Sequence, residues 1–119
     1  MAKRPDGALE HDIMAVLWAA EGPLLPGDIK GRLSTELAYT SVATVLGRLH
    51  TKGLVRRTEA GRAYAYEACI DESQLAVRRI GEVLGSASDK GQVLAGFVGS
   101  LSKKDIKALR AMLGKGDTQ

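Results

Sequence analysis

Residues 39–66 read YTSVATVLGRLHTKGLVRRTEAGRAYAY, which predicts one short helix followed by a basic two-stranded hairpin. The helix is expected over residues 40–52, and Gly53 is expected to end it. At about 100° per residue its apolar side chains fall on one narrow face. These side chains are Val42, Val45, Leu46 and Leu49. The stretch therefore predicts a helix with one buried side, packed beside a hairpin.

The opposite face of this helix carries no acid and little bulk. A merely solvated helix normally displays Glu and Lys there. Hydroxyls, small groups and a guanidinium instead suit a helix that enters the major groove of DNA and meets base edges and phosphates. The candidate DNA-binding residues are Thr40, Ser41, Ala43, Thr44, Gly47, Arg48 and Thr51, with Arg62 in the turn of the hairpin.

Charge distribution supports a nucleic-acid partner more than the overall charge does. The chain of 119 residues has a formal net charge of only +3. Within residues 40–66, however, the basic side chains are opposed by Glu59 alone. The basic residues of this window are Arg48, Lys52, Arg56, Arg57 and Arg62. A local basic field on a nearly neutral body is typical of a surface that binds phosphate.

Composition also limits the alternatives. The longest uncharged apolar run, residues 13–20, is too short to cross a bilayer, so no direct membrane insertion is expected. The single cysteine, Cys69, fits a reducing cytoplasm and is expected to be a small buried hydrophobe. No nucleophile–base pair, phosphate-binding loop or metal-ligand spacing is present. We therefore expect a cytoplasmic protein that is not an enzyme and has no metal site or cofactor.

Two further helices precede the decisive stretch. Apolar residues at helical spacing predict a helix over 9–20, and Pro26 suits the first turn of a second helix over 26–35. Thr40 is a candidate N-cap for the third helix. Strands over 54–58 and 63–66 flank a turn at 59–62. The predicted fold is mainly α (α+β), a winged helix-turn-helix DNA-binding domain over 1–69.

Residues 70–119 predict a three-helix C-terminal module. A capping box at 71–74 opens the first helix, the second covers about 89–99, and the third follows a cap at Ser102. Helices this short hold too few apolar side chains to close a core, so a second copy of the chain is the expected partner. The alternative is that they fold back on their own winged helix. The candidate dimerisation residues are Leu75, Leu84, Leu94, Phe97, Val98, Leu101, Ile106, Leu109 and Leu113.

The chain resembles the penicillinase repressor family (the BlaI/MecI type). The resemblance is carried by residues 39–49, by Lys52-Gly53-Leu54-Val55, by residues 61–66 and by the C-terminal run 97–102. It implies a homodimeric repressor that binds a palindromic operator in double-stranded DNA, often with a TACA/TGTA core. It also implies a partner, a membrane metalloprotease sensor that cuts the dimerisation domain at an Asn-Phe bond.

Two features of the family can be compared with this chain residue by residue. The position matching the cleaved bond is Gly96-Phe97, where Phe97 agrees with the family and Gly96 departs from it. The departure argues against cleavage there. Copper-responsive members carry a C-terminal cysteine cluster, which the lone Cys69 does not match.

A different class of function stays open at this point. Winged helices also serve as protein-interaction modules, and C-terminal helices can sense a small ligand. The acid-free helix face and the basic residues Arg48 and Arg62 favour the DNA-binding repressor.

Overall fold

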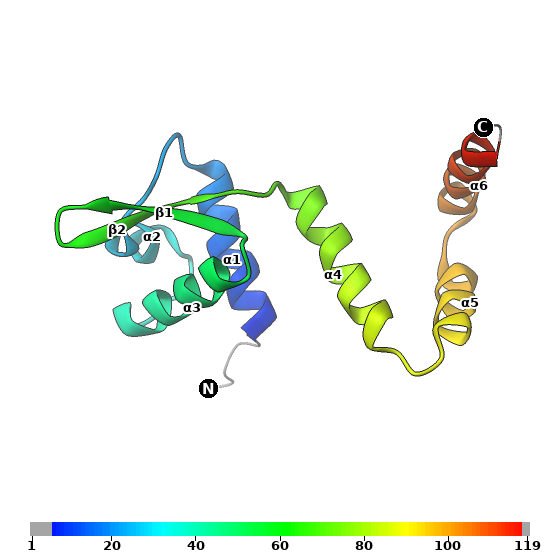
Figure 1. The fold of residues 1–119 in the computed structure, drawn as a ribbon, viewed down its shortest axis with the longest axis horizontal. Helices are drawn as coiled ribbons and strands as arrows, with labels where there is room; N and C mark the ends of the chain where they lie inside the picture. The colour runs from blue at the N-terminus through cyan, green and yellow to red at the C-terminus, as the bar shows by residue number, and fades with distance from the viewer. Residues whose placement is uncertain (1–5, 118–119) are drawn as a thin grey trace. The chain divides into compact units, whose positions relative to one another are not determined.

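The computed structural model describes residues 6–117, which form six helices and one two-stranded antiparallel sheet (Figure 1). The elements are α1 (Asp6–Ala19), α2 (Pro26–Arg32), α3 (Tyr39–Thr51), β1 (Val55–Ala60), β2 (Ala63–Ala68), α4 (Glu72–Ser86), α5 (Lys90–Ser100) and α6 (Lys103–Asp117). The described residues fall into two compact units, one up to Ala76 and one from Val77 onward.

The first unit is built around one apolar core, to which every predicted inner residue of α3 contributes. Val42, Val45, Leu46 and Leu49 are buried there, as the helical spacing predicts. They pack with side chains from α1, α2 and the hairpin in a single cluster. The other buried members of this cluster are Ile13, Met14, Leu17, Leu24, Ile29, Leu54, Val55, Tyr66 and Leu75. Burying one face of α3 leaves its other face outward.

The end of α3 is fixed by Gly53. Its φ of 77° is in the left-handed region, which glycine adopts without a Cβ clash. The backbone N–H of Gly53 donates to the His50 carbonyl, and that of Leu54 donates to the Leu49 carbonyl, both at 3.0 Å. This pair of bonds is a Schellman cap, and the buried Leu54 follows it into the core. The predicted end of the helix at Gly53 is therefore confirmed.

The hairpin leaves the core as a wing. Six residue pairs join β1 to β2, from Val55 opposite Ala68 to Ala60 opposite Ala63. The turn has only two residues, and Gly61 takes its first position with φ 69°. The strands are thus longer, and the turn shorter, than the sequence pattern predicts. At the base of the wing, Tyr66 exchanges backbone hydrogen bonds with Leu24, which ties the hairpin to the segment before α2.

Helix boundaries in the first unit differ from the predicted ones in all three helices, and the first covers Asp6–Ala19 instead of residues 9–20. The second helix ends at Arg32 rather than at residue 35, because Leu33 is already extended with ψ 140°. The third begins at Tyr39 with Ala38 as its N-cap, so the prediction that Thr40 caps the helix is wrong. Thr40 lies one residue inside the helix, where its carbonyl accepts a hydrogen bond from Thr44. Pro26 occupies the first turn of α2 as predicted.

Each helix of the C-terminal part begins at a side-chain cap. Asp71 and Gln74 form the predicted capping box, in which each side chain accepts from the other residue's backbone N–H. Asp89 caps α5 through the Gln92 N–H, and Ser102 caps α6 through the Asp105 N–H. The caps explain why three short helices begin where they do. They do not bury apolar side chains, so they do not provide these helices with a hydrophobic core.

No side chain between residues 77 and 114 is buried, although many are large and apolar. The most exposed are Val77, Ile80, Val83, Val93, Leu94, Phe97, Val98, Met112 and Leu113, each more than 40% exposed. Leu84, Leu101, Ile106 and Leu109 are half-buried. By contrast, Leu75 is 2% exposed and belongs to the core of the first unit.

The position of Leu75 corrects one prediction and moves a boundary. Leu75 cannot contribute to a dimerisation surface while it fills the core of its own winged helix. Because it lies in the first turn of α4, that turn belongs to the first unit. The division between the units accordingly falls after Ala76, later than the expected boundary at residues 69 and 70.

Candidate nucleic-acid interface

The outer face of α3 is open along its whole length within the first unit. Thr40, Ser41, Thr44, Arg48 and Thr51 are exposed, and the small residues Ala43 and Gly47 are half-buried between them. The structure thus brings seven of the eight predicted DNA-binding residues onto one continuous surface. The eighth, Arg62, is exposed in the two-residue turn of the wing.

Two of the hydroxyl groups on this face are already oriented by the helix itself. Thr44 Oγ1 donates to the Thr40 carbonyl at 2.8 Å, and Thr51 Oγ1 donates to the Gly47 carbonyl at 3.0 Å. These bonds use the hydroxyl protons, so the outward oxygens can accept hydrogen bonds but cannot donate to a phosphate. An accepting oxygen beside a methyl group suits an exocyclic base amine or a thymine methyl better than a phosphate.

Gly47 has no reason within the protomer to be a glycine. A Cβ added at this position would meet nothing within 4 Å. In the middle of a helix, glycine costs about 1 kcal/mol relative to alanine. The absence of a side chain at Gly47 leaves room for an outside molecule to approach the helix backbone closely.

A shallow basic hollow lies beside the outer face of α3 and extends to β1. Its volume is about 590 Å³, and no acidic side chain lines it. The lining residues are Thr44, Gly47, Arg48, His50, Thr51, Lys52 and Arg57. An open, cationic hollow next to a helix of this kind is suited to a polyanion rather than to a small apolar ligand.

Lys52 and Arg56, which belong to the predicted phosphate-binding field, are both engaged by carboxylates. Lys52 Nζ lies 3.0 Å from both carboxylate oxygens of Glu10, whose side chain is only 8% exposed. Arg56 Nε lies 2.6 Å from Glu67 Oε1 on the paired strand. The hydrogen bond and the charge of Glu67 raise the pKa of Arg56 above its ordinary value. The local positive charge is therefore smaller than the sequence window suggests.

Arg57 is a candidate interface residue that the sequence alone leaves undecided. Successive residues of a strand face opposite sides, so only one of Arg56 and Arg57 can point toward α3. The structure selects Arg57, because it lines the basic hollow while Arg56 pairs with Glu67 on the other side of the wing. The alternation of side chains along a strand predicts that Arg56 and Arg57 lie on opposite faces of the hairpin. The sequence does not indicate which of these faces packs toward the rest of the unit.

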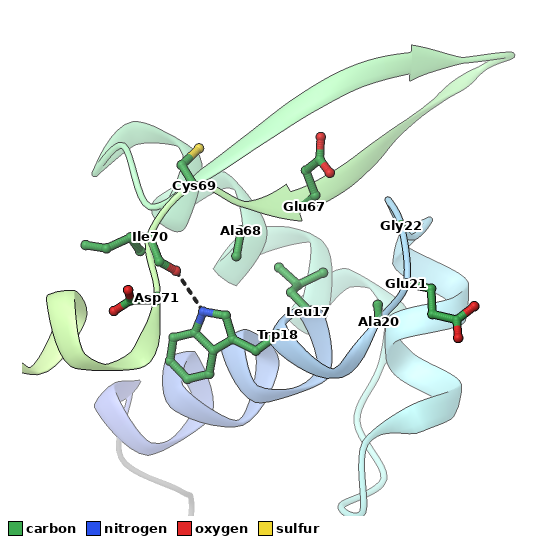
Figure 2. A pocket seen from close by; sticks show the side chains of 10 residues that line it. All are labelled: Leu17, Trp18, Ala20, Glu21, Gly22, Glu67, Ala68, Cys69, Ile70 and Asp71. Carbon is green, nitrogen blue, oxygen red and sulfur yellow. Dashed lines mark hydrogen bonds between the residues drawn. The ribbon is translucent and has the colours of Figure 1, made fainter.

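A second hollow of the first unit, about 360 Å³, lies where α1 meets the end of β2 (Figure 2). Among its lining residues, the Trp18 indole N–H donates to the Ile70 carbonyl at 2.8 Å, which ties α1 to the segment that follows the wing. Trp18 therefore anchors α1 to the residues that follow the wing. Cys69, at the rim, is exposed, so the expectation that it is buried is wrong.

Within residues 6–117, no group of three or more His, Cys, Asp or Glu side chains is arranged to hold a metal ion. None of the helices described in the chain has both the length and the apolar character needed to span a membrane.

Comparison with known proteins gives a consistent picture. The sequence profile described as penicillinase repressor matches residues 7–115. The chain belongs to the penicillinase repressor family. The family consists of transcriptional regulators rather than enzymes. Over 114 residues the chain is 32% identical to the transcriptional regulator BlaI of Mycobacterium tuberculosis, in both strains CDC 1551 and H37Rv, covering 92% of this chain and 83% of that protein.

A solved structure supports the same fold. The structure of hsRosR-S4 is 23% identical to this chain, with a TM-score of 0.51 over 86% of this chain and 90% of that one. A MarR family protein from Bacillus stearothermophilus is 18% identical, with a TM-score of 0.47 over 99% and 75% of the two chains. The predicted winged helix-turn-helix fold and the family resemblance are both confirmed.

Proposed function

We propose that the protein is a homodimeric repressor that inserts α3 into the major groove of a palindromic operator. The observation that carries this proposal is the outer face of α3, which is exposed, free of acid, and continuous with a basic hollow. Membership of the penicillinase repressor family supports the same function.

The chemistry of the face assigns different tasks to its two ends. Thr40 and Ser41 lie in the first turn, where the positive end of the helix dipole attracts a phosphate. Within residues 6–117 their hydroxyls make no hydrogen bond, so both can donate to DNA. Thr44 follows one turn later with an accepting oxygen and a methyl group for base edges. Gly47 then lets the groove wall approach the helix backbone.

Dimerisation is inferred from the second unit, which has no buried side chain of its own between residues 77 and 114. Helices α4 and α5 enclose an apolar hollow of about 310 Å³, lined by Arg79, Ile80, Val83, Leu84, Val93, Leu94 and Phe97. Exposed apolar surface on this scale is unfavourable in water unless another surface covers it. A second copy of the same helices is the partner we propose, because each protomer presents the same unfilled apolar face.

Release of the operator by proteolysis would require cutting within α5. Gly96 and Phe97 are both exposed, and Phe97 also lines the apolar hollow. A protease cleaves extended backbone, so the bond would have to leave its helix first. We propose a membrane metalloprotease sensor as a partner on the family resemblance alone. Gly96 departs from the family's cleaved Asn-Phe bond and argues against cleavage at this position.

Replacement of Arg48 by alanine tests the proposed interface. We expect Arg48→Ala to weaken binding to a duplex containing an inverted TACA/TGTA repeat by roughly tenfold, because one charge-assisted contact is lost. The exposed side chain contributes little to the core, so the melting temperature should change by only a degree or two. Fluorescence anisotropy and thermal unfolding measure the two quantities.

The same variant separates the two roles open to Arg48. Loss of affinity for the repeat duplex alone would mean that Arg48 reads a base, whereas an equal loss on a scrambled duplex would mean that it binds a phosphate. Unchanged affinity for both duplexes would remove Arg48 from the interface.

A further inference from the structure

We propose that Arg57, oriented by the ring of Tyr64, binds a DNA backbone phosphate in the hollow between α3 and the wing. This inference rests on the proposed function and adds one phosphate-binding residue and one positioning residue to it. Neither follows from the outer face of α3, because both side chains belong to the wing.

The register of the hairpin places the two residues on one face. Arg57 is paired with Tyr66, and Tyr64 is two residues along β2 from Tyr66, so all three side chains lie on the same side of the sheet. Tyr66 is buried at the base of the wing, which shows that this side is the one turned toward the rest of the unit. Tyr64 lies farther out and is 39% exposed.

Contact between the two side chains holds the guanidinium in place. Arg57 Cζ lies 4.3 Å from the centroid of the Tyr64 ring, within the range of a cation–π interaction. Stacking on a ring leaves the edge of the guanidinium, with its N–H donors, available for another partner. Because the ring restricts the long Arg side chain before DNA binds, less rotamer entropy is lost on binding.

The surroundings of Arg57 favour an anion. It shares the basic hollow with Arg48, and no carboxylate lines that hollow. Glu59 is on the same face of β1, but it lies opposite Tyr64, nearer the turn, and outside the lining. When a helix occupies the major groove, the phosphates beside that groove lie next to the helix. The hollow beside α3 is therefore placed for the DNA backbone, and two guanidiniums can bind a phosphate with directed N–H donors.

Arg56 provides a matched control on the same strand. It has the same charge and adjacent sequence position, but it faces the other side of the wing and pairs with Glu67. A general effect of removing positive charge from the wing would appear equally in Arg56→Ala and Arg57→Ala. A phosphate contact in the hollow would appear only in Arg57→Ala.

The experiment measures binding of the full-length variants to an inverted TACA/TGTA repeat duplex and to a scrambled duplex across a salt series. We expect Arg57→Ala to weaken binding to both duplexes by about the same factor, roughly tenfold at low salt. We also expect the slope of log K against log salt to fall in magnitude by about 0.9 for each Arg57 phosphate contact removed. Arg56→Ala should leave the slope unchanged.

Tyr64 is tested separately as a positioning residue. Tyr64→Leu should weaken binding about threefold by freeing the guanidinium, and Tyr64→Phe should restore most of that affinity because the ring face is retained. A purely structural role for Tyr64 would instead lower the melting temperature of the leucine variant and leave the affinity of the folded protein unchanged.

Three outcomes would overturn this inference. They are an unchanged salt slope in Arg57→Ala, equal effects of Arg56→Ala and Arg57→Ala, and a Tyr64→Phe variant no better than Tyr64→Leu. If Arg57→Ala binds normally while Arg48→Ala does not, the inference fails and the proposed function stands. If the unmodified protein binds neither duplex at 50 mM salt, both fail.

Discussion

Replacing Leu94 with Asp should convert the protein to a monomer and weaken its binding to an inverted-repeat duplex by roughly 10²–10⁴-fold. Linking two DNA-binding units through a dimer makes the second binding event intramolecular, and this gain in avidity is lost when the dimer dissociates. Leu94 is 46% exposed in the protomer and lines the apolar hollow between α4 and α5. A carboxylate buried there against a second copy would have no partner of opposite charge, which is strongly unfavourable.

A matched control lies on the same helix. Gln92 is exposed two residues earlier on α5, on the side opposite the apolar face, so Gln92→Asp adds the same charge without entering the hollow. It should remain dimeric and bind normally. Sedimentation equilibrium and anisotropy measure the two properties. A monomeric Leu94→Asp variant with full affinity would show that the C-terminal helices have another task.

Salt should weaken binding to the inverted-repeat duplex by about a thousandfold between 50 and 200 mM. Each phosphate neutralised by the protein contributes about −0.9 to the slope of log K against log salt. The proposed interface of each protomer has three guanidiniums, those of Arg48, Arg57 and Arg62, and hence six in a dimer. Six contacts give a slope of about −5, and a fourfold rise in salt then accounts for the thousandfold loss.

The magnitude of this slope shows whether three or all five of the basic residues in each protomer bind phosphate. If Lys52 and Arg56 also bound phosphate, ten contacts per dimer would give a slope near −9 and a loss of about 10⁵. We expect the smaller value because Glu10 and Glu67 already engage these two side chains. A slope near −9 would mean that the ion pairs open on DNA, and a slope near zero would contradict phosphate binding altogether.

The sequence predicts the helical part of the interface well for a simple physical reason. A period of 3.6 with four apolar residues on one side fixes which side of α3 is buried, and the outer residues follow from it. Gly53 and the box at Asp71 and Gln74 act through local backbone bonds, so their positions are also visible in the sequence.

The incorrect predictions concern residues whose contacts are with segments distant in the sequence. Glu10 reaches Lys52 across 42 residues, and Glu67 lies one residue beyond the window in which the charges were counted. Leu75 has the spacing of a C-terminal helix but packs in the core of the first unit. The inward face of the wing is set by the bridge between Leu24 and Tyr66, which no local pattern in the sequence reveals. The position of Arg57 beside α3 could therefore be recognised only from the three-dimensional structure.

Mapping backbone amide chemical shifts during titration of the full-length protein with a mixed-sequence duplex shows directly whether the outer face of α3 contacts DNA. We expect the largest shifts in Thr40–Thr51, with further shifts at Arg57 and Arg62 in the wing. Binding that left the α3 amides unmoved while those of another element shifted would contradict this expectation.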